Sequence, residues 1–228
     1  MHNSVVNVLV ANEQHLSYSQ IICDEMESSA KARGTGISKR TPDYITKKIL
    51  EGKAVIALTS SGTWVGFCYI ETWSHGNYVA NSGLIVAPDY RKTGLARKIK
   101  KKVFELSRTN YPNAKIFGLT TGLAVMKINS DLGYGPVTYS ELTQDEAFWK
   151  GCQSCVNFEI LKSNERKNCM CTAMLFNPKE NKKKWDFKKH SKLYERFMRM
   201  KQNRLFKYFK KQSILKKTKS LILFNYAK

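Results

Sequence analysis

Hydrophobic and polar residues follow two different periods along the first 140 residues. Stretches in which apolar residues alternate or run together predict strands, whereas apolar residues three and four positions apart predict helices. The segment 41–52 shows the clearest helix boundaries, with Thr41 as N-cap, Pro42 at the first helical position and Gly52 after the end. The predicted strands are 4–10, 54–59, 63–70, 78–86 and 115–119, and the predicted helices are 18–33, 41–52, 93–107 and 123–132.

The order of these elements predicts an α+β (α/β layered) domain, in which helices cover one mixed β-sheet. Apolar residues make up 42% of the chain, enough to build a buried core. Beyond Pro178 the composition changes sharply to lysine and aromatic residues. We therefore expect a core at 1–140, an extension that completes the domain at 141–178, and a tail at 179–228.

The net charge of +21 is concentrated in this tail, which holds 18 Lys or Arg and three acidic residues and so carries +15. The charge therefore says little about what the preceding domain does. The first twenty residues show no basic segment followed by an apolar one, so no signal peptide is predicted. The late apolar run 220–227 is too short to cross a bilayer. A soluble, cytoplasmic protein is expected.

The stretch VAPDYRKTGLARKIKKK, residues 86–102, joins an apolar strand to a helix with a basic first turn. One interpretation is an ordinary helix start with solvated lysines. The other is a phosphate site, because a helix N-terminus presents unpaired N–H groups and the positive end of its dipole. Gly94 lets the backbone approach phosphates closely, and the surrounding Arg and Lys residues add positive charge. The sequence favours the phosphate site.

The residues GLIVAPDYRKTGLA resemble the coenzyme A motif of the GNAT N-acyltransferases, Gln/Arg-x-x-Gly-x-Gly/Ala, with Arg91, Gly94 and Ala96 at its defined positions. The resemblance covers roughly residues 4–140 and includes the order of the elements. It implies that the strand ending at Val86 separates from its neighbour at a bulge, pairs with the pantetheine arm and polarises the acyl carbonyl. The residues expected to contact coenzyme A are Leu84, Ile85, Val86, Arg91, Lys92, Thr93, Gly94, Leu95, Ala96, Arg97 and Asn129.

The catalytic groups are less clear from the residues. Members of this family often protonate the departing thiolate with a tyrosine four residues before the Gly of an LGF or LGY ending, where this chain has Asn129. Tyr134, in the LGY itself, is the alternative proton donor, and a core aromatic otherwise. Glu71 and His75 are candidate bases, and ordinary strand-end and loop residues otherwise. We select Glu71 and Tyr134 as the candidate catalytic residues.

Four cysteines follow in the extension, as a CxxC (Cys152, Cys155) and a CxC (Cys169, Cys171). The segments VNFEIL and CTAMLF between and after them predict a β-hairpin. Four thiolates at the base of such a hairpin would suit a structural zinc ion, while the alternatives are reduced core thiols and a redox switch. Cys23 and Cys68 lie in apolar patterns and are expected in the core.

The resemblance implies transfer of an acetyl group from acetyl-CoA, or a succinyl group from succinyl-CoA, to a primary amine. The ending FWKGC…SC…C-C is similar to acyltransferases of bacterial arginine biosynthesis, so a small amino acid such as glutamate is the leading acceptor. Lys127, Lys150 and Arg166 are candidate partners for its carboxylates. A protein lysine or N-terminal amine is the enzymatic alternative.

The non-enzymatic alternative is an inactive module that binds RNA or a membrane through the tail. An amphipathic helix is expected there at 191–212, docked on the domain, on an anionic membrane surface or on RNA. An oligomer is also compatible with the sequence.

Overall fold

The computed structural model describes residues 5–33, 40–180 and 199. The chain divides into two compact units, Met1–Trp185 and Asp186–Lys228. The predicted tail helix at 191–212 therefore lies outside the described residues apart from residue 199. Its docking on the domain, on a membrane or on RNA stays a prediction. No helix in the described ranges has the length and apolar character needed to cross a bilayer.

The first unit follows the predicted order and confirms the mixed sheet covered by helices. Its strands are β1 (Val6–Val10), β2 (Ala54–Thr59), β3 (Trp64–Trp73), β4 (Tyr78–Val86), β5 (Lys115–Thr120), β6 (Gly135–Val137) and β7 (Thr172–Phe176). Its α-helices are α1 (Ser19–Arg33), α2 (Pro42–Leu50), α3 (Leu95–Asn110), α4 (Leu123–Asp131), α5 (Glu146–Lys150) and α6 (Phe158–Ser163). Short 3₁₀ turns are η1 (Glu13–Tyr18), η2 (Pro88–Tyr90) and η3 (Tyr139–Glu141).

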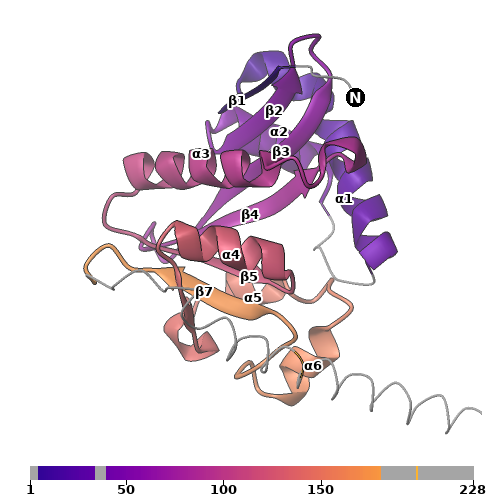
Figure 1. Ribbon diagram of the computed structural model, residues 1–228. Helices are drawn as coiled ribbons and strands as arrows, with labels where there is room; N and C mark the ends of the chain where they lie inside the picture. The colour runs from indigo at the N-terminus through magenta and orange to yellow at the C-terminus, as the bar shows by residue number, and fades with distance from the viewer. Residues whose placement is uncertain (1–4, 34–39, 181–198, 200–228) are drawn as a thin grey trace, which may run out of the picture. The chain divides into compact units, whose positions relative to one another are not determined.

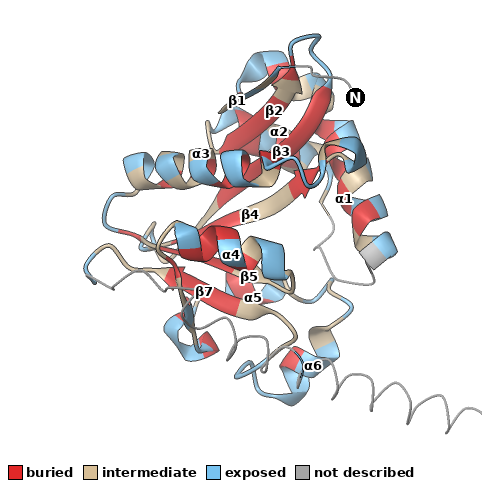
Figure 2. Cartoon of the chain, in the orientation of Figure 1, coloured by how far each residue is buried: buried red, intermediate tan, exposed pale blue. Residues whose placement is uncertain are grey.

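The seven strands form one sheet in the order β1-β2-β3-β4-β5-β7-β6. All neighbours are antiparallel except β4 and β5, which run parallel. Helices α3 and α4 cover one face of the sheet, and α1 and α2 pack on the other (Figure 1). Burial follows this layering, because β2 and β3 are largely buried and β4 is buried in part, while the helices expose their outer sides (Figure 2).

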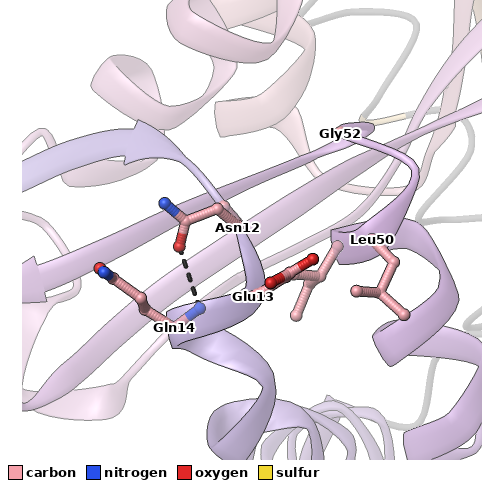
Figure 3. Close-up of a pocket in the computed structure, with 7 residues that line it drawn as sticks. Asn12, Glu13, Gln14, Leu50 and Gly52 are labelled. Carbon is pink, nitrogen blue, oxygen red and sulfur yellow. Dashed lines mark hydrogen bonds between the residues drawn. The ribbon is translucent and has the colours of Figure 1, made fainter.

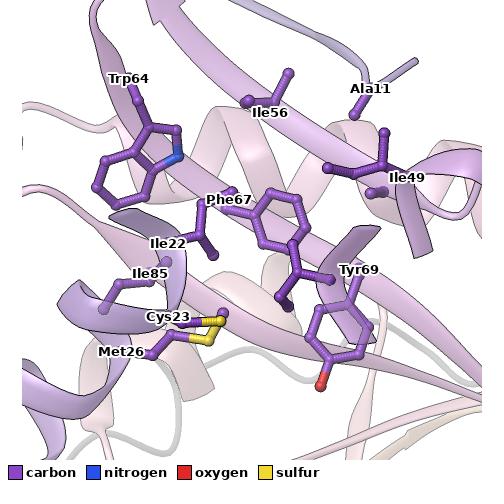
Figure 4. Packing of buried hydrophobic residues seen from close by; sticks show 12 residues of the cluster. Ala11, Ile22, Cys23, Met26, Ile49, Ile56, Trp64, Phe67, Tyr69 and Ile85 are labelled. Carbon is purple, nitrogen blue, oxygen red and sulfur yellow. The ribbon is translucent and has the colours of Figure 1, made fainter. Parts of the chain in front are cut away.

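The core on the α1–α2 face joins both helices to the middle of the sheet. Ile22 and Met26 of α1 and Ile49 of α2 pack against Phe67 and Tyr69 of β3 (Figure 4). After the register shift at Val65, odd-numbered residues such as Phe67 and Tyr69 face this core and even-numbered residues face α3. Trp64, before the shift, also lies in the core. A second core, which includes Phe117, Phe148 and Trp149, is formed between the sheet and helices α5 and α6.

The predicted Cys-rich hairpin is wrong in its first strand. The segment read as the strand VNFEIL is largely helix α6, in which Phe158 and Leu161 are spaced three apart and Leu161 is buried. Only the second predicted strand forms, as β7, and it pairs with β5 and β6. The cysteine-bearing segment thus completes the main sheet.

Candidate functional site

The two parallel strands in the middle of the sheet separate part-way along their length. Pairing between β4 and β5 runs from Tyr78↔Lys115 to Ala80↔Phe117 and then stops, although both strands continue. The edge of β4 from Asn81 to Val86 therefore does not pair with β5. An extended ligand with amide groups can add to such an edge as an extra strand.

A bulge in β4 marks the same region. Phe67 pairs with Ile85 while Tyr69 pairs with Ser82, so β4 holds one residue more than β3 in this interval. Gly83 has φ +65°, and a Cβ there would lie 2.3 Å from Cε1 of Tyr69. Only glycine allows the backbone to pass so close to this ring. The predicted bulge before Val86 is present.

The loop after β4 ends in a glycine N-cap. Gly94 has φ +86° and ψ 0°, and no side chain caps the first turn of α3. A Cβ on Gly94 would meet no protein atom within 4 Å, so the space in front of this helix N-terminus is open. The helix begins at Leu95 instead of the predicted residue 93, because Lys92 (φ +64°) and Gly94 both adopt left-handed conformations. The geometry fits an anion at the N-terminus of α3.

The predicted basic residues around this terminus make different contacts. Arg91 donates from Nε to the Val86 carbonyl over 3.1 Å, and from Nη2 to Glu25 Oε1 over 2.7 Å and to Ser29 Oγ over 2.8 Å. It thereby ties the loop to α1. Arg97 forms an ion pair with Asp131 of α4. Lys92 and Thr93 are exposed.

Asn129 and Tyr134 are both buried, Asn129 on α4 and Tyr134 against α3 and the sheet. Asn129 is 1% exposed, its Nδ2 lies 3.9 Å from Met174 Sδ, and its Oδ1 has no hydrogen-bond partner among the described residues. The Tyr134 hydroxyl donates to Asn81 Oδ1 over 2.9 Å, and Asn81 in turn donates to Ser107 Oγ over 2.7 Å. Burial raises the pKa of Tyr134 well above its usual value. These contacts give the ring a structural role, and its proton-donating role stays a prediction.

Glu71 lies near the end of β3, on the face covered by α2. Its Oε2 accepts a hydrogen bond from Lys48 Nζ over 3.0 Å, and its Oε1 is buried and has no hydrogen-bond partner among the described residues. Burial raises the pKa of the Glu71 carboxyl to about 7, whereas the positive charge of Arg40 acts in the opposite direction. A carboxyl that titrates near neutral pH is suited to take a proton from an amine.

The other predicted charges are on the surface. His75 is exposed in the loop after β3, and Lys127 and Lys150 are exposed on α4 and α5. Arg166 forms a two-pronged ion pair with Glu146, at 2.6 and 2.9 Å. The sequence predicted that Arg166 pairs with the carboxylates of an acceptor. In the structure its partner is the carboxylate of Glu146 on the surface.

A shallow surface pocket lies elsewhere, between η1 and α2 (Figure 3). Asn12, Glu13, Leu50 and Gly52 are among the residues that line it, and no predicted site residue does. The candidate site is therefore the separated edge of β4 together with the α3 terminus.

Comparison with protein families matches residues 23–124 to the Acetyltransferase (GNAT) family. Residues 23–124 therefore form a GNAT acetyltransferase domain. The predicted family is confirmed for these residues, and with it a domain of the N-acyltransferase class. No curated protein matches the chain.

Solved structures share the GNAT fold at low sequence identity. N-acetylglutamate synthase from Neisseria gonorrhoeae, complexed with coenzyme A and N-acetyl-glutamate, is 13% identical with a TM-score of 0.54; 78% of this chain matches 36% of that one. A GNAT acetyltransferase from Staphylococcus aureus is 15% identical with a TM-score of 0.53, over 77% and 100% of the two chains. A Mycobacterium tuberculosis protein in complex with CoA is 15% identical with a TM-score of 0.54, over 75% and 98%. This chain therefore spans about a third of the synthase.

The four cysteines of the GNAT chain do gather in space, as free thiols. The backbone of Asn157 links two of them, since its nitrogen donates to Cys155 Sγ over 3.5 Å and its carbonyl oxygen accepts from Cys169 Sγ over 3.8 Å. A hydrogen bond with Cys169 and burial raise the pKa of Cys171, and burial raises that of Cys152 to about 11. However, no group of three or more His, Cys, Asp or Glu side chains within the described ranges is placed to hold a metal ion. Zinc is not confirmed.

Sequence reasoning missed the residues that surround Glu71. Lys48 follows Ile45 by three positions and precedes Ile49, so its position on the buried side of α2 is visible in the helical period. Tyr69 precedes Glu71 by two positions and shares its face of β3. The contact of Arg40 Nε with the Tyr69 hydroxyl, 2.6 Å, joins residues 29 positions apart and left no local signal.

Replacing Gly94 by alanine should abolish most coenzyme A binding. The new Cβ meets no protein atom but projects into the space where the phosphates are expected. We expect a loss of at least tenfold in affinity, measured by calorimetry, together with about 1 kcal/mol of destabilisation from the left-handed backbone.

Gly52→Ala is the matched control, because Gly52 also has positive φ (+64°) and open space but lies after α2. It should lose similar stability and bind coenzyme A normally. Equal affinity in the two variants would contradict the placement of the phosphates.

Proposed function

We propose that this GNAT domain transfers an acetyl group from acetyl-CoA to the primary amine of a small amino acid. The proposed location of the enzyme is the cytoplasm. Two features support an acetyl-CoA site here. The N-terminus of α3 is open and has no side-chain cap among the described residues, and the edge of β4 is not paired with β5 from Asn81 onward. Pyrophosphate suits the first, and the amides of a pantetheine arm suit the second. A backbone N–H on the unpaired edge of β4 would stabilise the oxyanion of the acyl carbonyl.

Glu71 is the proposed general base. It takes a proton from the acceptor ammonium, and the freed amine attacks the thioester carbon. The C–S bond then breaks, the nitrogen loses its second proton as the amide forms, and the departing thiolate gains a proton, so that one net proton is left on Glu71. Tyr134 remains the predicted donor to the thiolate and regains the proton that the nitrogen loses. The buried Oε1 of Glu71, which has no hydrogen-bond partner among the described residues, is the atom proposed to take the first proton.

The amino-acid acceptor is supported by charge. Arg40 and Lys48 flank Glu71 on the α2 side, and both lie about 5.1 Å from the centroid of the Tyr44 ring. Two cations next to one carboxylate favour an acceptor that carries its own carboxylate over a polycation. The synthase of similar fold, which was solved with N-acetyl-glutamate, makes glutamate the first acceptor to test.

The direct experiment offers acetyl-CoA and succinyl-CoA to glutamate, ornithine, a polyamine and a lysine peptide, with products followed by mass spectrometry. We expect N-acetylated amino acid as the main product. Product with the peptide alone would move the acceptor to protein, and no product at all would favour a non-catalytic module.

Glu71→Gln should lower kcat by about 10²-fold or more, the usual size of a general-base contribution. Because the deprotonated carboxylate is the active form, wild-type kcat/KM should rise as pH increases through about 7, and the variant should lack this step. Affinity for coenzyme A should be unchanged. A variant with wild-type kcat would exclude Glu71 as the base.

A protein acceptor is the second candidate function, because the basic tail at 179–228 could recruit a macromolecule. Removal of these residues should leave kcat/KM for a small amino acid within about twofold if the acceptor is small. A large loss, restricted to a protein acceptor, would favour recruitment by the tail.

A further inference from the structure

The two carboxylate oxygens of Glu71 have different surroundings. Oε2 lies 3.0 Å from Lys48 Nζ, and the side chains of Lys48 and Glu71 are only 10% and 14% exposed. Oε1 is buried and has no hydrogen-bond partner among the described residues. A buried carboxylate oxygen without a donor is costly, and its presence calls for a ligand.

The position of Lys48 is itself costly. It lies on the buried side of α2 with Ile45 and Ile49, and burial lowers the pKa of its ammonium. The cost is offset by Glu71 and by the Tyr44 ring, whose centroid is 5.1 Å from Nζ. Because well-packed apolar residues often stabilise a core as well as a buried ion pair does, packing alone does not explain a lysine here.

The pair lies beside the start of the separated edge of β4, along which the donor is expected. Glu71 pairs with Ala80, the last residue of β4 that is also paired with β5. On the same face, Tyr69 packs directly against the bulge at Gly83. The carboxylate therefore belongs to the residue that pairs with the start of the separated edge, on the face covered by α2.

We propose that Lys48 is the positioning residue for the base of this acyl transfer. Its ammonium holds Oε2 and keeps Glu71 charged, so that Oε1 is presented to the acceptor ammonium and receives its proton. Lys48 stays protonated throughout, and the proton on Glu71 is lost to solvent after the product leaves. This inference rests on the proposed function, since it assigns a role to a neighbour of its base.

Other charges near the pair belong to several elements. On α2 and just after it, Glu51 Oε2 lies 3.9 Å from Lys48 Nζ but 2.9 Å from Lys53 Nζ, and Lys47 also reaches Glu51 at 3.9 Å. Arg40, before α2, lowers the pKa of Glu71. Tyr69 of β3 is buried, and its hydroxyl accepts from Arg40. Lys48 is the cation in direct contact with the Glu71 carboxylate.

The experiment compares Lys48→Met, Lys48→Arg and Lys47→Met. Lys47 is the matched control, because it neighbours Lys48 on α2 and contacts Glu51, but its side chain is 71% exposed. The Glu71 carboxyl is titrated by ¹³C NMR in the full chain, and kcat/KM for the acceptor is measured against pH.

In Lys48→Met the Glu71 carboxyl should titrate at least one pH unit higher, because the cation that favours its charged form is gone. The acidic limb of kcat/KM should move by the same amount, a tenfold loss on the acidic side. Lys48→Arg should restore most of both, and Lys47→Met should match wild type.

The outcomes separate the two proposals. An unchanged Glu71 titration in a folded Lys48→Met protein, or a shifted titration that the rate profile does not follow, would overturn the role of Lys48. A wild type that titrates near pH 7 but acylates no acceptor would instead contradict the proposed function.

Discussion

The rest of the site depends on the loss of pairing between β4 and β5 after Ala80↔Phe117. Buried backbone N–H and C=O groups nearly always find partners, so a sheet that opens in its middle exposes groups that another chain or ligand must complete. The bulge at Gly83 belongs to the same constraint, because it turns β4 away from the regular ladder while β3 stays paired with it. The donor site is thus a property of backbone geometry, and few side chains are needed to make it.

Polar groups accumulate on both faces of this opening. On the α1–α2 face the buried Lys48–Glu71 pair lies beside Tyr69. On the α3 face Lys100 is 2% exposed, and its Nζ lies 5.6 Å from the centroid of Tyr134. Burial lowers the pKa of Lys100, and no acidic side chain among the described residues forms an ion pair with it. Burying such charged groups lowers the stability of the core, and it places positive and negative charge close to the opening.

The sequence predicted most of the fold because its signals are local. The caps of α2 and the glycine before α3 each depend on a few neighbouring residues. It failed at α6, where the short apolar run was compatible with either period. It also missed the Lys48–Glu71 and Arg40–Tyr69 contacts, because they join residues more than 20 positions apart and depend on how α2 packs on β3. The donor motif was therefore readable in advance, while the surroundings of the base were not.

The position of β7 in the sheet has a consequence for how the protein is made. β7 lies between β5 and β6, yet it is the last strand of the described chain to be synthesised. Until residue 176 has left the ribosome, β5 can pair only with the first three residues of β4, and its other edge lacks β7. Such an edge is prone to pair with other chains, and contacts made across long stretches of sequence form slowly. A nascent chain that stalls just before β7 would carry the complete coenzyme A motif on an open, aggregation-prone sheet.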